Sequence, residues 1–341
     1  MQDPRRWVVV GLDNGGTMNN ATVLGSDGEF LVHRMVESPS HVTQGPEQAV
    51  EALARSLDQV LAFTGTERSM VRAVGLDTPG PVSADGIIAS RGSTNFGDPR
   101  WCGFDVRTAL EDRIGLAVVY NNDANAAALY AHHVYFGPVE ADLRSSVSAI
   151  VGTGLGGGVI EAGQVVRGTA GMAGELGHVW IPMDGLLGPG QPVPGCNCGL
   201  SADAESVASL TGIEKNLLPY WLRRFPDHEL ARVEPAKAAK LVRAFGEAGD
   251  QLALEIFEQQ AVAIGRLFTI AANFTDPDVY FVGGGVVEAA PHFRDWFLGR
   301  IHEHIILREE QAQAAAVALV PDLDMAGARG SAIAASAAVR D

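Results

Sequence analysis

The chain has 341 residues, enough for about two domains, each with its own core. Apolar residues make up 47%, charged residues 19%, and the formal net charge is −16, which argues against nucleic-acid and anionic-membrane partners because phosphates would be repelled. The 3 cysteines are too few for a disulfide framework and favour the cytoplasm, and no apolar run approaches the roughly 18 residues of a membrane span.

Strands and helices alternate along the first part of the chain. "WVVVGLD" (7–13) predicts a buried strand that ends in an acid, and residues 19–38 predict two strands joined by a turn at Ser26-Asp27-Gly28. Apolar residues recur at helical spacing over 45–63, which predicts an amphipathic helix. Residues 71–83 predict a strand that runs into a glycine and proline turn.

A helix, a strand and a second helix follow. "DVRTALEDRIG" (105–115) predicts a short helix with Asp105 as its N-cap. "LAVVYNND" (116–123) predicts an apolar strand that again ends in an acid. The next residues, "ANAAALYAHHVYF", predict a helix.

The second half repeats the opening pattern. Residues 145–166 predict a strand, a glycine loop and a second strand, with a turn near Gly163. Helices are predicted over 205–223 and 236–274, and a strand, a triple glycine and a helix over 278–301. The final segment, "AGARGSAIAASAAV", predicts a helix of small residues suited to close packing.

Both halves therefore open with a strand, a glycine turn and a returning strand, in "GLDNGGTMNNATVL" and "AIVGTGLGGGVIEA". Two related α/β domains that face one another would form a cleft lined by both turns. We expect a small first domain over residues 1–123, with a helix at about 325–341 packing back on it. The large second domain is expected over residues 124–324.

The two glycine loops suggest phosphate binding. In "DNGGT", Gly15 and Gly16 remove side chains, so backbone N–H groups can approach a phosphate, and Asp13 could hold Mg²⁺ through water; the alternative is a plain hairpin turn. "GTGLGGG" (152–158) contains the spacing G-x-G-x-x-G, but a dinucleotide site needs a helix to open at the third glycine. "GVIEAGQVV" predicts a hairpin instead, with Thr153 as a hydroxyl donor to phosphate.

Asp123 lies where a predicted strand meets a predicted helix. Aspartate is a favoured N-cap, so a purely structural role is one interpretation. The other is a general base, because phosphoryl transfer to an alcohol needs a carboxylate that orients the hydroxyl and accepts its proton.

The order of these segments resembles the ROK family of sugar kinases and repressors nearly end to end. "DNGGT" and "GTGLGGG" are similar to its two phosphate motifs, "NNDANAAA" to its catalytic motif, "DPDVYFVGGGV" to its adenosine motif and "GMAGELGH…CNCG" to its sugar and zinc signature. The resemblance implies a two-domain α/β fold of the actin-like ATPase (ribonuclease H-like) type with an interdomain cleft. It also implies a kinase that uses ATP and Mg²⁺ to phosphorylate a hexose hydroxyl, most simply glucose O6.

The resemblance also implies roles for individual residues. Asp123 would be the base that deprotonates the sugar hydroxyl. The residues that would bind the sugar are Gly80, Asn95, Asn122, Glu175, His178 and Glu205. The residues that would face the phosphates are Asp13, Gly15, Gly16, Thr17, Thr153 and Gly154, and those near the adenosine are Gly284 and Gly285.

A zinc site is implied in the segment at about 175–205. The family's ligands are one histidine and three cysteines; His178, Cys196 and Cys198 match, and Asp203 stands where the third cysteine is expected. A carboxylate can complete a tetrahedral zinc shell, so a structural Zn²⁺ on these four residues is the expectation. The alternative is a metal-free turn with two buried thiols.

Several alternatives stay open. The acceptor could be N-acetylglucosamine, N-acetylmannosamine, mannose or fructose, the donor could be polyphosphate, and a non-catalytic sugar-binding sensor is the competing class. The repressor role lacks a winged-helix module ahead of the first strand. Family likeness implies a homodimer.

Three features depart from the family pattern: Asn14, Met18 and the long connection at 183–195. That connection could reshape the sugar pocket or a dimer contact.

Overall fold

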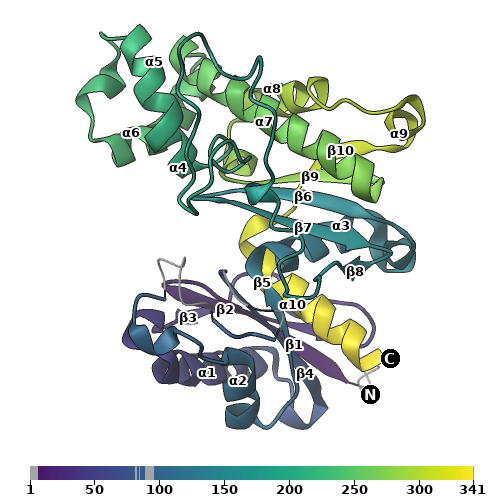
Figure 1. Cartoon of the computed structure of the whole chain (residues 1–341). Coiled ribbons are helices and arrows are strands. Elements are labelled where there is room, and N and C mark those ends of the chain that lie inside the picture. Colours follow the sequence, from purple (N-terminus) through teal and green to yellow (C-terminus); the bar gives the residue numbers. More distant parts are fainter. Residues whose placement is uncertain (1–6, 81–82, 84, 89–95, 341) are drawn as a thin grey trace. The chain divides into compact units, whose positions relative to one another are not determined.

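The chain forms two compact units, each of which combines distant segments (Figure 1). The computed structural model describes residues 7–80, 83, 85–88 and 96–340. The first unit contains Met1–Leu143, Ala162–Ala173 and Pro321–Asp341. The second unit contains Arg144–Glu161 and Gly174–Val320.

A five-stranded sheet forms the centre of the first unit, in the order β3-β2-β1-β4-β5. Its strands are β1 (Val8–Asn14), β2 (Met18–Gly25), β3 (Glu37–Pro39), β4 (Val71–Thr78) and β5 (Val118–Asn122). β1 runs antiparallel to β2 and parallel to β4, and β4 runs parallel to β5. The carboxyl ends of β1, β4 and β5 therefore meet at one edge, which is where ligands bind in many α/β sheets.

Helices cover both faces of this sheet (Figure 1). They are α1 (Pro46–Thr64), α2 (Val106–Ile114), α3 (Asp123–Glu140) and α10 (Leu323–Arg340), with 3₁₀ turns η1 (Val42–Gln44), η2 (Arg68–Met70), η3 (Pro99–Trp101) and η4 (Ala141–Leu143). The predicted cap is confirmed, because the Asp105 side chain accepts a hydrogen bond from Thr108 N at 2.8 Å. α3 loses helical geometry at Gly137, whose φ is 74°, ahead of Pro138.

The same tetrapeptide, V-G-L-D, occurs in β1 and β4, and the two copies pair residue for residue. Gly11 pairs with Gly75 and Asp13 pairs with Asp77. A Cβ atom at Gly11 would lie 1.9 Å from Ala328 O, and one at Gly75 would lie 1.9 Å from Ser331 O. The small residues predicted near the end of the chain therefore let α10 lie directly on the sheet backbone.

The second unit has its own sheet and core. Within it the strands lie in the order β10-β9-β6-β7, and their bounds are β6 (Ser146–Val151), β7 (Leu155–Glu161), β9 (Val279–Gly284) and β10 (Ala316–Leu319). The helices are α4 (Leu210–Gly212), α5 (Leu218–Arg224), α6 (Pro235–Glu247), α7 (Gln251–Thr275), α8 (Pro291–Glu303) and α9 (Glu309–Ala314). Shorter helical elements of this unit are η5 (Leu176–His178), the π-helix η6 (Ile213–Leu217), η7 (Glu229–Arg232) and η8 (Gly285–Glu288). The short strand β8 (Gln164–Val165) belongs to the first unit.

Three expectations change in the structure. The turn at Gly28 forms, but the returning segment pairs irregularly until β3, through an isolated bridge from Leu24 to Phe30 and separate backbone hydrogen bonds. The helix expected over 236–274 is two helices, since Gly249 has a φ of 80° and Asp250 caps α7. Helix α3, which the sequence analysis assigned to the second domain, lies in the first unit.

Candidate functional site

Three carboxylates gather at the carboxyl edge of the first sheet. Asp13 ends the apolar part of β1, Asp77 lies beside it on β4, and Asp123 follows β5. Asp77 is fully buried, and its Oδ2 accepts a hydrogen bond from the Ser331 hydroxyl at 2.8 Å. Sequence reasoning missed Asp77, although the repeated V-G-L-D was a signal that it would lie beside Asp13.

The first two of these acids hold protons more tightly than ordinary carboxyl groups. Burial raises the pKa of Asp13 to about 6, although the neighbouring side chain of Asp77 acts in the opposite direction. Burial and then the negative charge of Asp13 raise the pKa of Asp77 well above its usual value. Asp77 Oδ1 has no hydrogen-bond partner among the residues that the structure describes. A proton or a cation beside this atom would relieve the repulsion.

Asn122, and not Asp123, is the N-cap of α3. The Asn122 side-chain oxygen accepts hydrogen bonds from Ala124 N at 2.9 Å and Asn125 N at 3.3 Å. Asp123 is the first residue of the helix and is exposed, with Oδ1 2.8 Å from Ala124 N. The capping interpretation of Asp123 is therefore not needed to explain how the helix begins.

The other predicted ligand residues of the first unit lie on neighbouring loops. Gly15, Gly16 and Thr17 form the turn between β1 and β2, and a Cβ atom at Gly15 would lie 2.6 Å from Met18 O. Gly80 follows β4 at the same edge as the three acids. Asn95 lies outside the described residues.

In the second unit, Thr153 and Gly154 form the predicted turn between β6 and β7, which pair antiparallel. No helix opens after this loop, so the dinucleotide interpretation is wrong. Glu205 lies behind the turn: its Oε2 accepts a hydrogen bond from Leu155 N at 2.9 Å, and its Oε1 accepts one from the Cys196 thiol at 3.2 Å. Glu205 therefore ties the phosphate-type loop to the cysteine loop.

The triple glycine ends β9 as predicted. Gly284 has a φ of 95°, and a Cβ atom there would lie 1.9 Å from the backbone oxygen of Val151 on β6. Only glycine fits this position, for both its backbone angle and its space. Gly285 is exposed and begins the short 3₁₀ helix η8.

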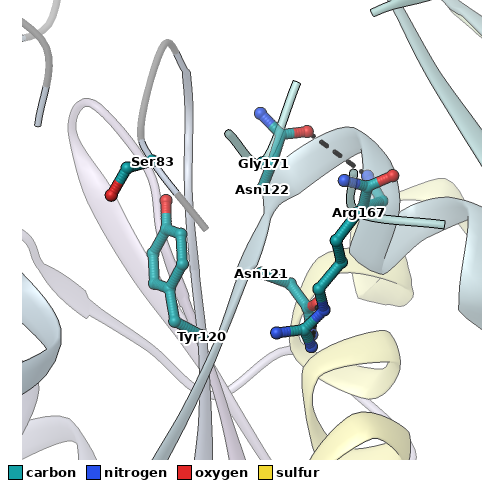
Figure 2. Close-up of a pocket in the computed structure, with 7 residues that line it drawn as sticks. Ser83, Tyr120, Asn121, Asn122, Arg167 and Gly171 are labelled. Atoms are coloured by element: carbon teal, nitrogen blue, oxygen red, sulfur yellow. Dashed lines mark hydrogen bonds between the residues drawn. The ribbon is translucent and has the colours of Figure 1, made fainter. Parts of the chain in front are cut away.

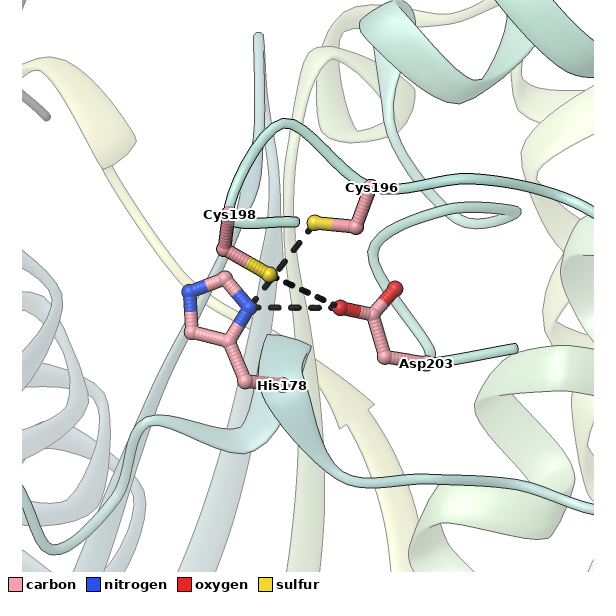
Figure 3. A group of neighbouring side chains, drawn as sticks. All are labelled: His178, Cys196, Cys198 and Asp203. Atoms are coloured by element: carbon pink, nitrogen blue, oxygen red, sulfur yellow. Dashed lines mark hydrogen bonds and ion pairs between the residues drawn. The ribbon is translucent and has the colours of Figure 1, made fainter. Parts of the chain in front are cut away.

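The four predicted metal ligands come together in the second unit (Figure 3). His178 ends η5, Asp203 lies in a bridge with Trp180, and Cys196 and Cys198 lie on a tight loop closed by a bridge from Gly195 to Ser201. One donor atom from each ligand falls within 4.8 Å of the others.

The donor atoms are close enough together to hold a metal ion. His178 Nδ1 lies 3.4 Å from Asp203 Oδ2 and 4.0 Å from Cys196 Sγ, and Cys198 Sγ lies 3.6 Å from Asp203 Oδ2. Ligands at the usual zinc bond lengths in a tetrahedron lie about 3.3 to 3.8 Å apart. Figure 3 shows that His178 uses Nδ1 here, so its Nε2 points away from the cluster.

The protonation of this cluster follows from its contacts. The hydrogen bond to Asp203 raises the pKa of His178 to about 9. Burial acts to raise the pKa of Asp203, but hydrogen bonds from His178, Cys196 and Ser206 hold it below its usual value. Asp203 is therefore a carboxylate, the form that can bind a metal. Burial also raises the pKa of the nearby Glu175.

The long connection at 183–195 is anchored to α7 by buried polar contacts. Gln259 Nε2 donates hydrogen bonds to Leu186 O at 2.8 Å and to Gln191 Oε1 at 2.7 Å. Trp221 Nε1 donates to Gln259 Oε1 at 2.8 Å. The connection is thus a fixed part of the second unit.

A small polar pocket lies in the first unit next to Asn122 (Figure 2). The residues that line it are Ser83, Tyr120, Asn121, Asn122, Asn125, Arg167 and Gly171. Arg167 reaches it from the segment 162–173, and its Nη2 donates a hydrogen bond to Asn121 Oδ1 at 3.1 Å. Sequence reasoning did not single out Asn121, Asn125 or Arg167.

The family model described as ROK family matches residues 9–338. The chain belongs to the ROK family. A glucokinase from Halalkalibacterium halodurans is 31% identical over 303 residues, which is 88% of this chain and 85% of the relative. An N-acetyl-D-glucosamine kinase from Vibrio vulnificus is 32% identical over 282 residues, 81% of this chain and 83% of the relative.

Solved structures of ROK proteins share the fold. A ROK hexokinase from Thermus thermophilus matches with a TM-score of 0.76 and 31% identity, over 98% of this chain and 99% of that one. A ROK glucokinase from Streptomyces griseus, in complex with glucose and AMPPNP, matches with a TM-score of 0.68 and 25% identity, over 96% and 99%. The predicted actin-like α/β fold is confirmed.

Among the helices in the described residues, none is long and apolar enough to cross a membrane.

Proposed function

We propose that this ROK protein transfers the γ-phosphoryl group of ATP to a hydroxyl group of a hexose, with O6 of glucose as the first candidate. The chain is a sugar kinase, a phosphotransferase with an alcohol group as acceptor, like its glucokinase and N-acetyl-D-glucosamine kinase relatives. The complex of the Streptomyces griseus glucokinase with glucose and AMPPNP supports ATP as donor and glucose as acceptor.

The observation that carries the proposal is the position of Asp123. Asn122 caps α3, while Asp123 places an exposed carboxylate at the carboxyl edge of the sheet. The Asp123 carboxylate would orient the sugar hydroxyl and accept its proton as the oxygen forms a bond to the γ-phosphorus and the bond to the leaving ADP oxygen breaks. The proposed sugar contacts are Gly80, Asn95, Asn122, Glu175, His178 and Glu205.

Phosphates would bind to amides of both glycine turns. The residues proposed for this are Gly15, Gly16, Thr17, Thr153 and Gly154, with Gly284 and Gly285 near the adenosine. Asp13 and Asp77 would hold Mg²⁺, which when bound would neutralise phosphate charge. Two adjacent carboxylates with a buried oxygen that lacks a partner among the described residues suit such a hard cation.

We also propose a structural Zn²⁺ on His178, Cys196, Cys198 and Asp203, which when bound would cross-link the loop. These residues would fix the His178 ring, leaving its Nε2 for the sugar. The role of this cluster is positional, since proton transfer is assigned to Asp123.

The test is ADP release from Mg-ATP with a panel of glucose, mannose, fructose, N-acetylglucosamine and N-acetylmannosamine. We expect one sugar to dominate, and we expect Asp123→Asn to lower turnover by about 10²-fold or more. Asp295→Asn, on an exposed carboxylate of α8, is the matched control and should keep full activity. Retained turnover in Asp123→Asn would rule out this base. If the protein binds a sugar but shows no turnover with either ATP or polyphosphate as donor, a non-catalytic sugar-binding sensor is favoured.

A further inference from the structure

The glycine turn between β6 and β7 carries two backbone N–H groups that pair with nothing in the described part of the chain. On one side of them, Gly152 N donates to Gly154 O at 2.9 Å. On the other side, Leu155 N donates to Glu205 Oε2 at 2.9 Å. The N–H groups in between, those of Thr153 and Gly154, have no acceptor among the described residues. Thr153 is exposed and Gly154 is partly exposed, so a ligand can reach this turn.

The first residues of α4 hold the carbonyl ends of the same two peptide groups. Leu210 N donates to Gly152 O at 3.0 Å. Thr211 donates twice to Thr153 O, from its backbone N at 3.1 Å and from its hydroxyl Oγ1 at 2.8 Å. A peptide group is almost always trans, with its carbonyl and its N–H pointing in opposite directions. The N–H groups of Thr153 and Gly154 are therefore both turned away from α4.

The segment that begins α4 is fixed by its own contacts. The Ser209 hydroxyl accepts a hydrogen bond from Gly212 N at 2.8 Å and donates one to Glu205 O at 2.7 Å. The buried Gln260 on α7 donates from Nε2 to Val207 O at 3.1 Å and to Ser209 O at 3.3 Å. The glycine turn is thus attached to a fixed part of the second unit.

We propose that Thr211 is a positioning residue for the nucleotide: by holding Thr153 O, it aims the Gly154 N–H at a phosphate oxygen of ATP. The inference rests on the proposed sugar kinase function, in which this turn binds phosphate. Two adjacent N–H groups that are turned the same way suit an anion, because each can donate to it without reorienting first. The single hydroxyl proton of Thr211 is already donated to Thr153 O, so Thr211 acts through the turn and not by donating to a phosphate itself.

The test removes the Thr211 hydroxyl and keeps the shape of the side chain. Calorimetry measures binding of Mg-AMPPNP, of Mg-ADP and of the sugar that the acceptor panel identifies, on the wild type, Thr211→Val and Thr211→Ser. Thr211→Val should bind both nucleotides about two- to tenfold more weakly, the range for one lost hydrogen bond. Its sugar affinity should be unchanged. Thr211→Ser keeps the donor and should restore nucleotide binding. In steady-state kinetics, Thr211→Val should raise the KM for Mg-ATP and leave the KM for the sugar unchanged.

A matched control separates this effect from a general loss of stability. The Thr275 hydroxyl on α7 also donates to a backbone carbonyl, Ala271 O at 2.9 Å. Thr275→Val should therefore keep the affinities of the wild type for nucleotide and sugar. Thermal melting checks that every variant is folded, and Thr211→Ala removes the same donor should Thr211→Val not fold.

The outcomes distinguish the two levels of the argument. Suppose that the wild type phosphorylates a sugar with ATP. Unchanged nucleotide affinity in Thr211→Val, an equal loss of sugar affinity, or no recovery in Thr211→Ser would then overturn the role of Thr211 and leave the kinase proposal intact. A wild type that binds neither AMPPNP nor ADP would overturn the ATP-dependent function, and the role of Thr211 with it.

Discussion

Asp13 and Asp77 lie side by side on β1 and β4, and this placement opposes folding at neutral pH. Burial raises the pKa of Asp13 to about 6, above its value in an unfolded chain, and the pKa of Asp77 also rises. Between about pH 4 and pH 6 the folded protein therefore holds protons that the unfolded chain has released. The stability contributed by this pair falls as the pH rises through that window, and it goes on falling above it until the raised pKa of Asp77 is passed.

Asp77→Asn should stabilise the folded protein at neutral pH, because it removes one of the two adjacent carboxylates. The amide keeps an oxygen for the Ser331 hydroxyl but carries no charge beside Asp13. We expect the Tm at pH 8, in EDTA, to rise by about 2 to 4 °C, with a smaller gain at pH 4.5, where the wild-type pair is protonated. If the variant has a lower Tm than the wild type at pH 8, or if its gain in Tm is larger at pH 4.5 than at pH 8, carboxylate repulsion is not the cause.

Asp203 should determine how tightly the proposed site of the second unit binds zinc. A thiolate suits Zn²⁺ better than a carboxylate, so Asp203→Cys should raise zinc affinity by about tenfold or more, and Asp203→Ala should lower it by at least as much. Competition with a chromophoric chelator measures both. Equal affinity in all three proteins, or well under half an equivalent of metal in wild type purified without chelator, would argue for a metal-free loop.

For single residues, the sequence predicted the role correctly where that role depends only on neighbours in the chain. Asp105 was predicted as a cap because its side chain reaches the next turn of its own helix. Asp77 and Arg167 were missed because their importance depends on neighbours 64 and 46 residues away in the chain, Asp13 and Asn121. A repeated tetrapeptide signalled the first contact, and nothing in the sequence signalled the second.

At the level of elements, glycine determines how closely α10 approaches the sheet. A Cβ atom at Gly75 would overlap the backbone oxygen of Ser331, which cannot move without displacing the helix. Gly75→Ala should therefore lower the free energy of unfolding by about 1 to 3 kcal/mol. Gly299→Ala, within α8, has no atom within 4 Å of the added Cβ and should leave stability unchanged or raise it by about 0.5 to 1 kcal/mol. Chemical denaturation measures both, and equal effects would contradict the packing argument.

Element prediction was accurate where periodicity is strong, as in α1 (Pro46–Thr64), and weaker where pairing depends on distant residues. The returning strand after Gly28 alternates in sequence but pairs regularly only at β3. The connection at 183–195 gave no periodic signal, because it is held by Gln259 on α7 and not by its own backbone pattern.

At the scale of the whole molecule, the first unit depends on residues 321–341. Deleting this segment would expose the Gly11 and Gly75 face of the sheet that α10 covers. We expect amides of β1 and β4 to exchange hydrogen at least tenfold faster in the truncated protein, while β6 and β9 keep their protection. Mass spectrometry of exchanged peptides measures this, and unchanged exchange in β1 would show that α10 is dispensable.

The discontinuous first unit also sets an order of assembly during synthesis. The ribosome delivers all of the second unit, up to Val320, before it releases the helix that covers β1 and β4. The unit that begins first is thus completed last. A nascent chain lacks the helix that supplies Ser331 to Asp77, so the acid edge of the sheet matures only when translation of α10 is finished.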